Sequence, residues 1–361
     1  MYIKNLVLKN FRNYGEEKFE FSSGLNVLFG KNAQGKTNCA EAVFYLCTGL
    51  SPRTRREKQL IKSGEQVANI SCVCEGRYGE VEISASIREN GREVRINGNK
   101  ITRNADLMGN VFAVFFSPQE LRLIQDGPDE RRRFLNVSIS QLSRSYFVAL
   151  SRYNKILEQR NNLLKSRDLD TVYDTLPVWD AQLCKYGAIV ASSRADYVAK
   201  LAPLAAEAHA YLTDGQEQLL ISPEKKYKGD AAELEKRLYD ELSNNYDRDV
   251  RLGFTASGPH RDDLDIAING VDAKNFASQG QTRTAALSIK LAEVNVFKDA
   301  CGEYPVLILD DVMSELDLPR RKKLVGRTDG LQTIITCTHA ERVLYGKEVK
   351  KIMIEGGAVK R

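Results

Sequence analysis

Two groups of residues that could bind a nucleotide lie near opposite ends of this 361-residue chain. Residues 30–37 read Gly-Lys-Asn-Ala-Gln-Gly-Lys-Thr, which fits the phosphate-loop pattern G-x-x-x-x-G-K-[ST]. Far downstream, Asp310 and Asp311 follow the apolar run Leu307-Ile308-Leu309. A small kinase or GTPase closes such a site within one compact domain. The large insertion between the two halves should therefore decide the function.

The first group has the local context that phosphate binding requires. Residues 25–29 form an apolar run typical of a buried central strand, and residues 36–49 favour a helix. The glycines between them allow successive N–H groups to face an anion at the positive end of that helix. Lys36 would reach the β- and γ-phosphates, and Thr37 would offer its hydroxyl to Mg²⁺.

The second group would complete the site at the end of a strand. Pro305 can start this strand, and its apolar run carries Asp310 to the edge where ligands of open α/β sheets bind. We expect Asp310 to hold Mg²⁺ through water, and Asp311 to orient or deprotonate the attacking water. The alternative is that Asp310 and Asp311 are simply the first residues of a loop and have no role in a site. The phosphate loop upstream makes this alternative the weaker one.

Composition limits the class of protein. No apolar run approaches the ~20 residues of a membrane span, and the first residues lack a signal-peptide core, so we expect no membrane partner and a cytoplasmic location. The seven cysteines follow no zinc spacing and suit a reducing compartment. A net charge of +5 permits a nucleic-acid partner without proving one.

The elements that must position these residues fall into two parts of the chain, one with expected strands and hairpins and one with helical periodicity. Strands are expected at 2–8, 17–29 and 111–116, with hairpins between 68 and 102. Residues 129–212 have helical periodicity and predict a helical hairpin, broken near 166–178 by a polar stretch with Pro177. After a mixed segment, the expected helix, strand, helix and strand are at 280–300, 305–310, 318–327 and 331–336.

Two further groups could contact a phosphate. Ser278-Gln279-Gly280-Gln281 precedes a helix and makes a second helix end suited to an anion. Since the phosphate loop already binds the one γ-phosphate, this end most simply faces the nucleotide of another subunit. An ordinary helix cap is the alternative. His339 follows an apolar strand and lies where it could contact the γ-phosphate, although a lone histidine there is more often structural.

Together these strings resemble a known family. Residues 30–38 resemble the Walker A element of ABC-type ATPase heads, and residues 278–281 resemble the signature of these heads. Residues 309–317 resemble Walker B with its D-loop, and residues 338–339 resemble the switch histidine. Among such heads the chain resembles the SMC-like proteins of DNA repair, and more specifically the bacterial RecF recombination mediators. The most specific strings for this resemblance are at 8–14, 51–56, 116–121, 127–135 and 258–263.

The resemblance implies both a fold and an organisation into lobes. The fold would be α/β, an ABC-type P-loop ATPase head with a mixed sheet, an antiparallel β-layer, an inserted helical lobe and no long coiled coil. Lobe I would comprise residues 1–117 and 285–361. The mainly helical lobe II, with the signature, would comprise residues 118–284.

The resemblance also implies a weak ATPase that acts as a nucleotide-gated clamp. ATP with Mg²⁺ would join two copies into a homodimer, with each nucleotide between the phosphate loop of one copy and Ser278 of the other. The dimer would hold duplex DNA or a junction of single strand and duplex, and hydrolysis would release it. The protein would help to load a RecA-type recombinase with RecO- and RecR-type partners.

The resemblance assigns roles to individual residues. Its catalytic group is Asp311, Gln119 and His339. Its metal group is Thr37, Gln119 and Asp310. Its cofactor-binding group is Arg12, Gly30, Lys31, Asn32, Ala33, Gln34, Gly35, Lys36, Thr37, Asn38, Ser278, Gly280 and Gln281. Asp311 stands where most ABC heads have glutamate, and its reach is shorter.

A basic stretch provides candidate contacts to DNA. Residues 51–62 contain Arg53, Arg55 and Arg56 together with two lysines, against one acid. Such a cluster can follow a phosphate backbone, and its contribution to affinity should fall steeply with salt. No base-reading motif accompanies it, which favours recognition of the backbone without sequence specificity.

Three other functions remain open from the residues. The first is a P-loop phosphotransferase, although no acceptor-binding signature is visible. The second is another SMC-like ATPase of DNA maintenance or defence, for which a nuclease domain or a long coiled coil would be the mark. The third is a nucleotide clamp that does not hydrolyse ATP.

Overall fold

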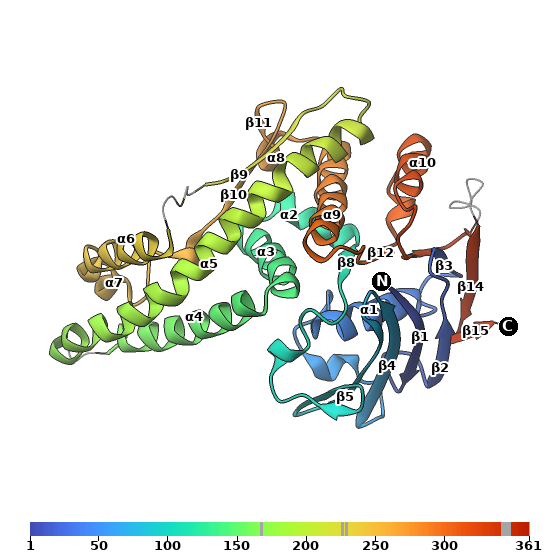
Figure 1. Cartoon of the computed structure of the whole chain (residues 1–361), viewed down its shortest axis with the longest axis horizontal. Helices are drawn as coiled ribbons and strands as arrows, with labels where there is room; N and C mark the ends of the chain where they lie inside the picture. Colours follow the sequence, from blue (N-terminus) through green and yellow to red (C-terminus); the bar gives the residue numbers. More distant parts are fainter. Residues whose placement is uncertain (167–168, 225–226, 228–229, 341–347, 361) are drawn as a thin grey trace. The chain divides into compact units, whose positions relative to one another are not determined.

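The structure is a computed structural model that describes residues 1–166, 169–224, 227, 230–340 and 348–360. It divides into two compact units (Figure 1). Unit 1 comprises Met1–Leu121, Leu204–Gln218 and Ser278–Arg361, and unit 2 comprises Arg122–Pro203 and Leu219–Ala277. Among the described residues, no helix is both long and apolar enough to cross a bilayer.

A six-stranded mixed sheet carries the phosphate loop in unit 1. Its order is β15-β14-β3-β13-β12-β8, and all neighbours are parallel except the antiparallel pair β14 and β15. Strands β12 and β13 are buried along their whole length, which explains why both are continuous apolar runs. The strands are Leu25–Phe29 (β3), Ala113–Phe116 (β8), Val306–Asp310 (β12), Thr333–Cys337 (β13), Val349–Glu355 (β14) and Ala358–Lys360 (β15).

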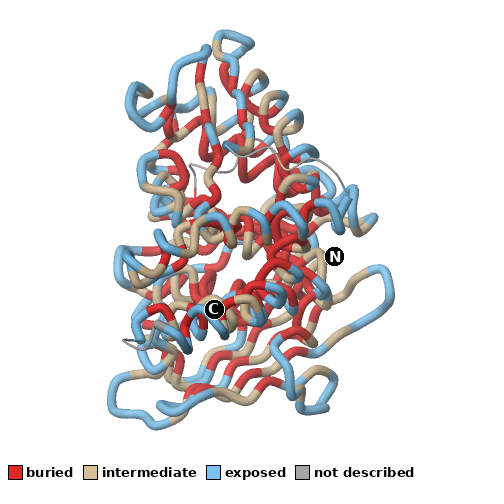
Figure 2. The backbone as a smooth tube through the Cα atoms, turned by 90° about the vertical axis from the view of Figure 1, so that its left-hand side faces the viewer, coloured by how far each residue is buried: buried red, intermediate tan, exposed pale blue. Residues whose placement is uncertain are grey.

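The second sheet of unit 1 is antiparallel and has the order β2-β1-β4-β5-β6-β7. Buried and more exposed residues alternate along its strands because successive side chains point to opposite faces. Figure 2 shows the alternation as red and pale segments along neighbouring strands. The strands are Tyr2–Lys9 (β1), Glu16–Glu20 (β2), Val67–Gly76 (β4), Gly79–Arg88 (β5), Gly91–Ile96 (β6) and Asn99–Lys100 (β7).

Helix α1 (Lys36–Thr48) follows the phosphate loop and contacts strands of both sheets. Eleven of its residues are buried, so apolar side chains surround the helix instead of forming one stripe. Helix α9 (Gln279–Cys301) contacts β8, and α10 (Leu318–Gly326) follows the acidic end of β12. The contacts that α1 makes with strands of both sheets fix the start of that helix.

Unit 2 combines helices with a three-stranded antiparallel sheet of order β11-β10-β9. Helix α5 supplies most of its length to this unit, and its last turns belong to unit 1. The strands are Leu219–Pro223 (β9), Leu264–Ile268 (β10) and Val271–Asp272 (β11). The helices are Arg122–Gln125 (α2), Pro128–Leu142 (α3), Arg144–Leu163 (α4), Leu169–Leu212 (α5), Ala231–Ser243 (α6), Tyr246–Leu252 (α7) and Ala273–Phe276 (α8).

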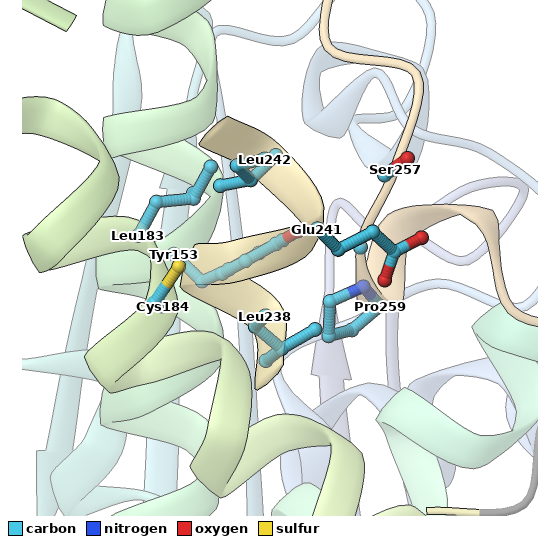
Figure 3. A pocket seen from close by; sticks show the side chains of 9 residues that line it. Tyr153, Leu183, Cys184, Leu238, Glu241, Leu242, Ser257 and Pro259 are labelled. Atoms are coloured by element: carbon cyan, nitrogen blue, oxygen red, sulfur yellow. The ribbon is translucent and has the colours of Figure 1, made fainter. Parts of the chain in front are cut away.

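The core of unit 2 contains both an ion network and an apolar cavity. The fully buried guanidinium of Arg160 donates to Asp180 at 2.5 Å and to Asp249 at 2.7 Å. A cavity of about 10 Å³ lies elsewhere in the unit, where Leu238 and Cys184 converge with the ring of Tyr153 (Figure 3). In the ion network of Arg160, removal of either Asp180 or Asp249 would leave a buried charge without its partner. Such a loss lowers the free energy of unfolding by about 3–5 kcal/mol.

The sequence-based expectations for individual elements were partly wrong. Residues 17–29 form two strands instead of one, because the Asn26 side chain accepts from Ser22 N at 2.7 Å and closes a turn. The predicted helical hairpin is three helices, α3, α4 and α5, and Ser143 caps the start of α4. Pro177 lies inside α5, where Val172 and Leu176 pack on Leu164.

The predicted lobes and the observed units differ in three short segments. Residues 118–121, 204–218 and 278–284 were expected in lobe II, and all three belong to unit 1. The last of these segments carries the signature, which therefore shares a compact unit with the phosphate loop. The predicted fold class itself is confirmed: a mixed sheet, an antiparallel layer and a helical insertion.

His260 makes the stability of the protein dependent on pH. Burial lowers its pKa to about 4, and its ring bonds Tyr153 at 2.7 Å and the Thr255 carbonyl at 3.0 Å. An unfolded histidine has a pKa of about 6.5, so below that pH the unfolded chain binds the proton first. The free energy of unfolding should therefore fall between pH 6.5 and 4, by up to about 3 kcal/mol.

Denaturant unfolding at pH 7 and at pH 5 would measure this loss. The His260→Asn variant, which cannot titrate, is the control and should show a smaller difference between the two pH values. Equal differences in both proteins would contradict the assignment to His260.

Candidate nucleotide-binding site

The parallel strands of the mixed sheet bring the two halves of the predicted site to one edge. Strand β3 ends at Phe29, directly before the phosphate loop, and β12 ends at Asp310. Strand β13 lies between them and pairs with both. Carboxyl ends of neighbouring parallel strands share an edge, so the halves meet although the chain separates them widely.

Backbone geometry explains the first glycine of the loop. Gly30 has a φ of 148°, and a Cβ there would lie 2.2 Å from the carbonyl oxygen of Ile354 on β14. No side chain could be accommodated at this approach without moving the strand. The loop is also held from the same direction by Gly356, whose N–H donates to the Gln34 side chain at 2.5 Å.

The far end of the loop is held from the N-terminal part of the chain. The Asn13 side chain donates to the Gln34 carbonyl at 3.0 Å, and the Tyr14 hydroxyl donates to the Gly35 carbonyl at 2.9 Å. Gly357 N donates to the same Gln34 carbonyl at 3.1 Å. These contacts fix the loop before any ligand is bound.

Lys36 lies across the mouth of the loop. Its Nζ donates to the carbonyls of Gly30 at 2.8 Å and Lys31 at 2.7 Å. Burial lowers the pKa of this ammonium, and the charge of Asp311 opposes that effect. Phosphate oxygens facing Nζ would favour its charged form, as expected of a phosphate-binding lysine.

Asp310 receives hydrogen bonds from both sides. Thr37 Oγ1 donates to its Oδ1 at 2.8 Å, and Thr336 Oγ1, from β13, donates to the same atom at 2.7 Å. Burial raises the pKa of Asp310, while these two hydroxyls and the charge of Arg53 lower it. A buried carboxylate beside a threonine hydroxyl fits a hard cation such as Mg²⁺, which prefers oxygen ligands.

Asp311 has a left-handed backbone, with φ of 54°. Its N–H donates to Thr336 Oγ1 at 3.0 Å, and the Ser314 hydroxyl donates to its carboxylate at 3.1 Å. This conformation turns Asp311 away from the line of β12, and the residue joins the lining of the loop cavity. The two adjacent acids thus have different surroundings.

A cavity of about 430 Å³ lies over the phosphate loop. Among the described residues, its lining contains seven of the predicted cofactor-binding residues together with Asp311. It also contains three residues that the sequence did not assign to it: Asn13, Arg53 and Thr336. The seven are Asn32, Ala33, Gln34, Gly35, Lys36, Thr37 and Asn38, of which Thr37 also belongs to the predicted metal group.

Arg53, which was predicted to bind DNA, lines the cavity over the phosphate loop. Its guanidinium donates to Asn38 Oδ1 at 2.8 Å and lies 3.5 Å from Glu41. The fully buried Glu41 also binds Arg12 through two hydrogen bonds, at 2.8 and 2.9 Å. Arg12, predicted to bind the cofactor, is therefore engaged by an acid and lies outside the described lining. Glu41 was missed because it stands in an otherwise apolar helix without a motif.

The remaining predicted residues lie outside the described lining of the cavity. Gln119 is exposed in the short 3-10 turn Pro118–Leu121 that follows β8. His339 is exposed, and its carbonyl accepts from the Cys337 thiol at 3.3 Å. Lys31 contributes its carbonyl to Lys36. The structure thus brings the Walker residues together, whereas Gln119 and His339 are not among the described residues that line the cavity.

The predicted signature begins α9 as an exposed helix end. Ser278 Oγ accepts from Gln281 N at 3.2 Å, and Gln281 Oε1 accepts from Ser278 N at 2.9 Å. This reciprocal pair is a capping box. Ser278 and Gly280 are exposed, and the nearest atom to a Cβ at Gly280 would be Ser278 Oγ at 4.0 Å, an ordinary contact. Ser278 therefore acts as a helix cap, and the start of α9 is accessible to solvent.

Arg55 and Arg56 shortly precede, in the chain, the first residues that line a polar groove. Both are exposed. The groove has a volume of about 640 Å³, and its lining includes Lys58, Lys62 and Arg88 with two glutamates. Arg88, from β5, was missed because it is distant from the basic stretch in sequence.

Comparison with known proteins assigns the family. The model of the RecF/RecN/SMC N-terminal domain matches residues 2–360. The DNA replication and repair protein RecF of Lachnoclostridium phytofermentans is 42% identical over 96% of this chain and 95% of its own length. RecF of Clostridium acetobutylicum is 40% identical over 94% and 93%. The chain belongs to the RecF family.

Solved structures of RecF agree with this assignment. The recombination mediator protein RecF-ATPrS in the RecFOR pathway superposes with a TM-score of 0.92 at 34% identity, over 99% of this chain and 97% of that one. An SMC head bound to the C-winged helix domain of ScpA is only 16% identical, with a TM-score of 0.59, and shares the fold. RecF-family members are thus ATPase heads of the SMC type, as the sequence resemblance implied.

Proposed function

We propose that this protein is an ATP-dependent DNA-binding protein of recombinational repair and replication restart. ATP would join two copies into a dimer that clamps duplex or gapped DNA, and slow hydrolysis would release it. The observation that carries the proposal is the position of the signature: Ser278 is exposed and lies outside the described lining of its own chain's phosphate cavity. Such an end is available to the nucleotide of a second copy.

The residues of the cavity fit ATP and Mg²⁺ as cofactors. Lys36 and the N–H groups of the loop would bind the β- and γ-phosphates. The Thr37 hydroxyl and the Asp310 carboxylate, 2.8 Å apart, would hold Mg²⁺ directly or through water. A bound Mg²⁺ would neutralise negative charge on the phosphate oxygens.

The remaining roles concern water and the dimer. Asp311 would orient the attacking water, because its carboxylate lines the cavity beside Lys36. Gln119 and His339 would approach the γ-phosphate only when the nucleotide is enclosed, since both are exposed in this chain. This requirement would make turnover depend on dimer formation.

The partners of the proposed clamp follow from the family. The relatives are named DNA replication and repair proteins, and the similar solved RecF belongs to the RecFOR pathway. By that likeness, we infer RecO- and RecR-type mediators as partners and loading of a RecA-type recombinase as the outcome. DNA would be held by its backbone, through basic residues such as Arg55 and Arg56.

Sedimentation with and without ATP tests the proposal as a whole. The protein should be monomeric without nucleotide and dimeric with ATP, and duplex or gapped DNA should cosediment only with the dimer. Single-stranded DNA alone is the comparison and should bind less. A monomer that binds DNA equally in both conditions would contradict the clamp.

The Asp311→Asn variant should bind ATP but hydrolyse it at least ~10-fold more slowly, because the amide cannot accept a proton from water. Asparagine tolerates the left-handed backbone at this position, so the loop should keep its shape. Steady-state phosphate release and equilibrium ATP binding measure the two properties. Normal hydrolysis by this variant would assign the general base elsewhere; no hydrolysis by the unmodified protein would indicate a purely structural clamp.

Replacing Arg55 and Arg56 together by glutamine should weaken duplex binding and lower the salt slope of the affinity by up to about 2. Both arginines are exposed, and Lys58 and Lys62, which follow them in the chain, line a polar groove. Arg53→Gln is the matched comparison and should alter ATP binding instead, since Arg53 lines the nucleotide cavity. Duplex affinity measured at several salt concentrations gives the slope, and an unchanged slope would remove this segment from the DNA interface.

A further inference from the structure

A hydrogen-bonded chain lies directly behind the predicted signature. Gln281 Nε2 donates to Glu217 Oε1 at 3.0 Å. The other carboxylate oxygen of Glu217 is 3.2 Å from His209 Nε2, and His209 Nδ1 is 3.2 Å from the Ser288 hydroxyl. All four residues belong to unit 1, where the end of α5 and the segment after it meet α9.

Glu217 determines which way the Gln281 carboxamide faces. A carboxylate can only accept, so the amide nitrogen must point toward Glu217. The amide oxygen is then left for the Ser278 N–H, which can only donate. Without Glu217, the carboxamide could turn over and present a donor to that N–H, which would break one half of the capping box.

His209 in turn holds Glu217. Its side chain is fully buried, whereas Glu217 is 19% exposed. Burial lowers the pKa of His209, which favours the neutral ring. A neutral ring must carry its proton on Nε2 to donate to the carboxylate, and its Nδ1 lies 3.2 Å from the hydroxyl of Ser288, whose own hydrogen is donated to the Thr284 carbonyl at 2.7 Å. The ring therefore connects Glu217 to Ser288 on α9, ten positions after Ser278 in the chain.

We propose that Glu217 and His209 are positioning residues that hold Ser278–Gln281 in the shape required by the nucleotide of a second copy. The inference rests on the proposed function, because it assumes that this helix end completes the ATP site across a dimer. Neither residue touches the nucleotide in this scheme. They act through Gln281 and α9, and no motif in the sequence marks either of them.

Replacing Glu217 by alanine should weaken the ATP-dependent dimer about tenfold, since it removes a hydrogen bond to a charged group behind the contact. ATP binding by the monomer should be unchanged, because the phosphate cavity has none of these residues in its described lining. Sedimentation at several protein concentrations and equilibrium ATP binding measure the two quantities. Glu207→Ala is the matched control: this glutamate is exposed, lies on the same segment and pairs with Arg327.

Two further variants separate a positioning role from general damage. Glu217→Gln keeps an acceptor for Gln281 but loses a charge, so its dimer should be stronger than that of Glu217→Ala. In the double variant Glu217→Ala with Gln281→Ala, the two losses should be less than additive, because both residues act in one chain of bonds. Additive losses, or a dimer of normal strength in Glu217→Ala, would overturn the inference. Failure of the unmodified protein to dimerise with ATP would instead overturn the proposed function.

Discussion

Replacement of Lys36 by methionine should abolish ATP-dependent DNA binding and weaken ATP binding by at least ~100-fold. The Nζ of Lys36 lies at the mouth of the phosphate loop, 2.8 and 2.7 Å from two backbone carbonyls, where it would meet the phosphates. Methionine has a similar length but no charge, so the helix should remain packed. Equilibrium ATP binding and duplex binding in the presence of ATP measure the effect.

The control for this variant is Lys18→Met, an exposed lysine on β2 that pairs with Glu20. It changes the net charge by the same amount without touching the cavity. Duplex binding by Lys36→Met that still responds to ATP would mean that the nucleotide does not act through the phosphate loop.

Replacement of Ser278 by arginine should prevent the ATP-dependent dimer while each monomer still binds ATP. Ser278 is exposed at the start of α9, and its hydroxyl caps that helix. A long cationic side chain would occupy the space that the γ-phosphate of a second copy needs. We expect the dimer constant to weaken by at least ~100-fold, which corresponds to about 3 kcal/mol.

The effect of losing the Ser278 hydroxyl as a helix cap must be separated from the steric and charge effect of the introduced arginine. Ser278→Ala removes the hydroxyl and costs about 1 kcal/mol at the helix end, with no added bulk. It should therefore weaken the dimer less than Ser278→Arg. Ser151→Arg, on the exposed side of α4, controls for added charge. A normal dimer of Ser278→Arg by sedimentation would contradict a shared site.

Local patterns predicted the strands and the loop that form the centre of the site. β12 and β13 are apolar throughout because both faces are covered, and the glycine-bounded loop could be read without any contact information. Parallel strands then imply that Asp310 and Thr37 share an edge, as observed.

Contacts between distant residues could not be predicted in this way. Asn13 supports the loop from 21 positions upstream, and Thr336 binds Asp310 from 26 positions downstream. The basic residues around Arg53 predicted contacts with DNA and gave no sign of the hydrogen bond that its guanidinium makes with Asn38 at the cavity. Periodicity describes one element at a time, so the partner of a polar side chain stays open until the sheets are assembled.

The prediction that Pro177 lies in a break between helices was wrong. Pro177 lies within α5 because packing of Val172 and Leu176 against Leu164 offsets the lost backbone bond. Strands β14 and β15 were missed, although β14 pairs with β3 along its length. Charged residues interrupt β14, and only Ile352 and Ile354 of this strand are buried.

The close approach of Gly30 to Ile354 has a consequence for synthesis on the ribosome. The phosphate loop emerges early in translation, yet the backbone that supports it, from Ile354 to Gly357, is made more than 300 residues later. Contacts so remote in sequence can form only after most of the chain has been released from the exit tunnel. We expect nascent chains to be unable to bind ATP, which would keep unfinished copies from joining complete ones on DNA.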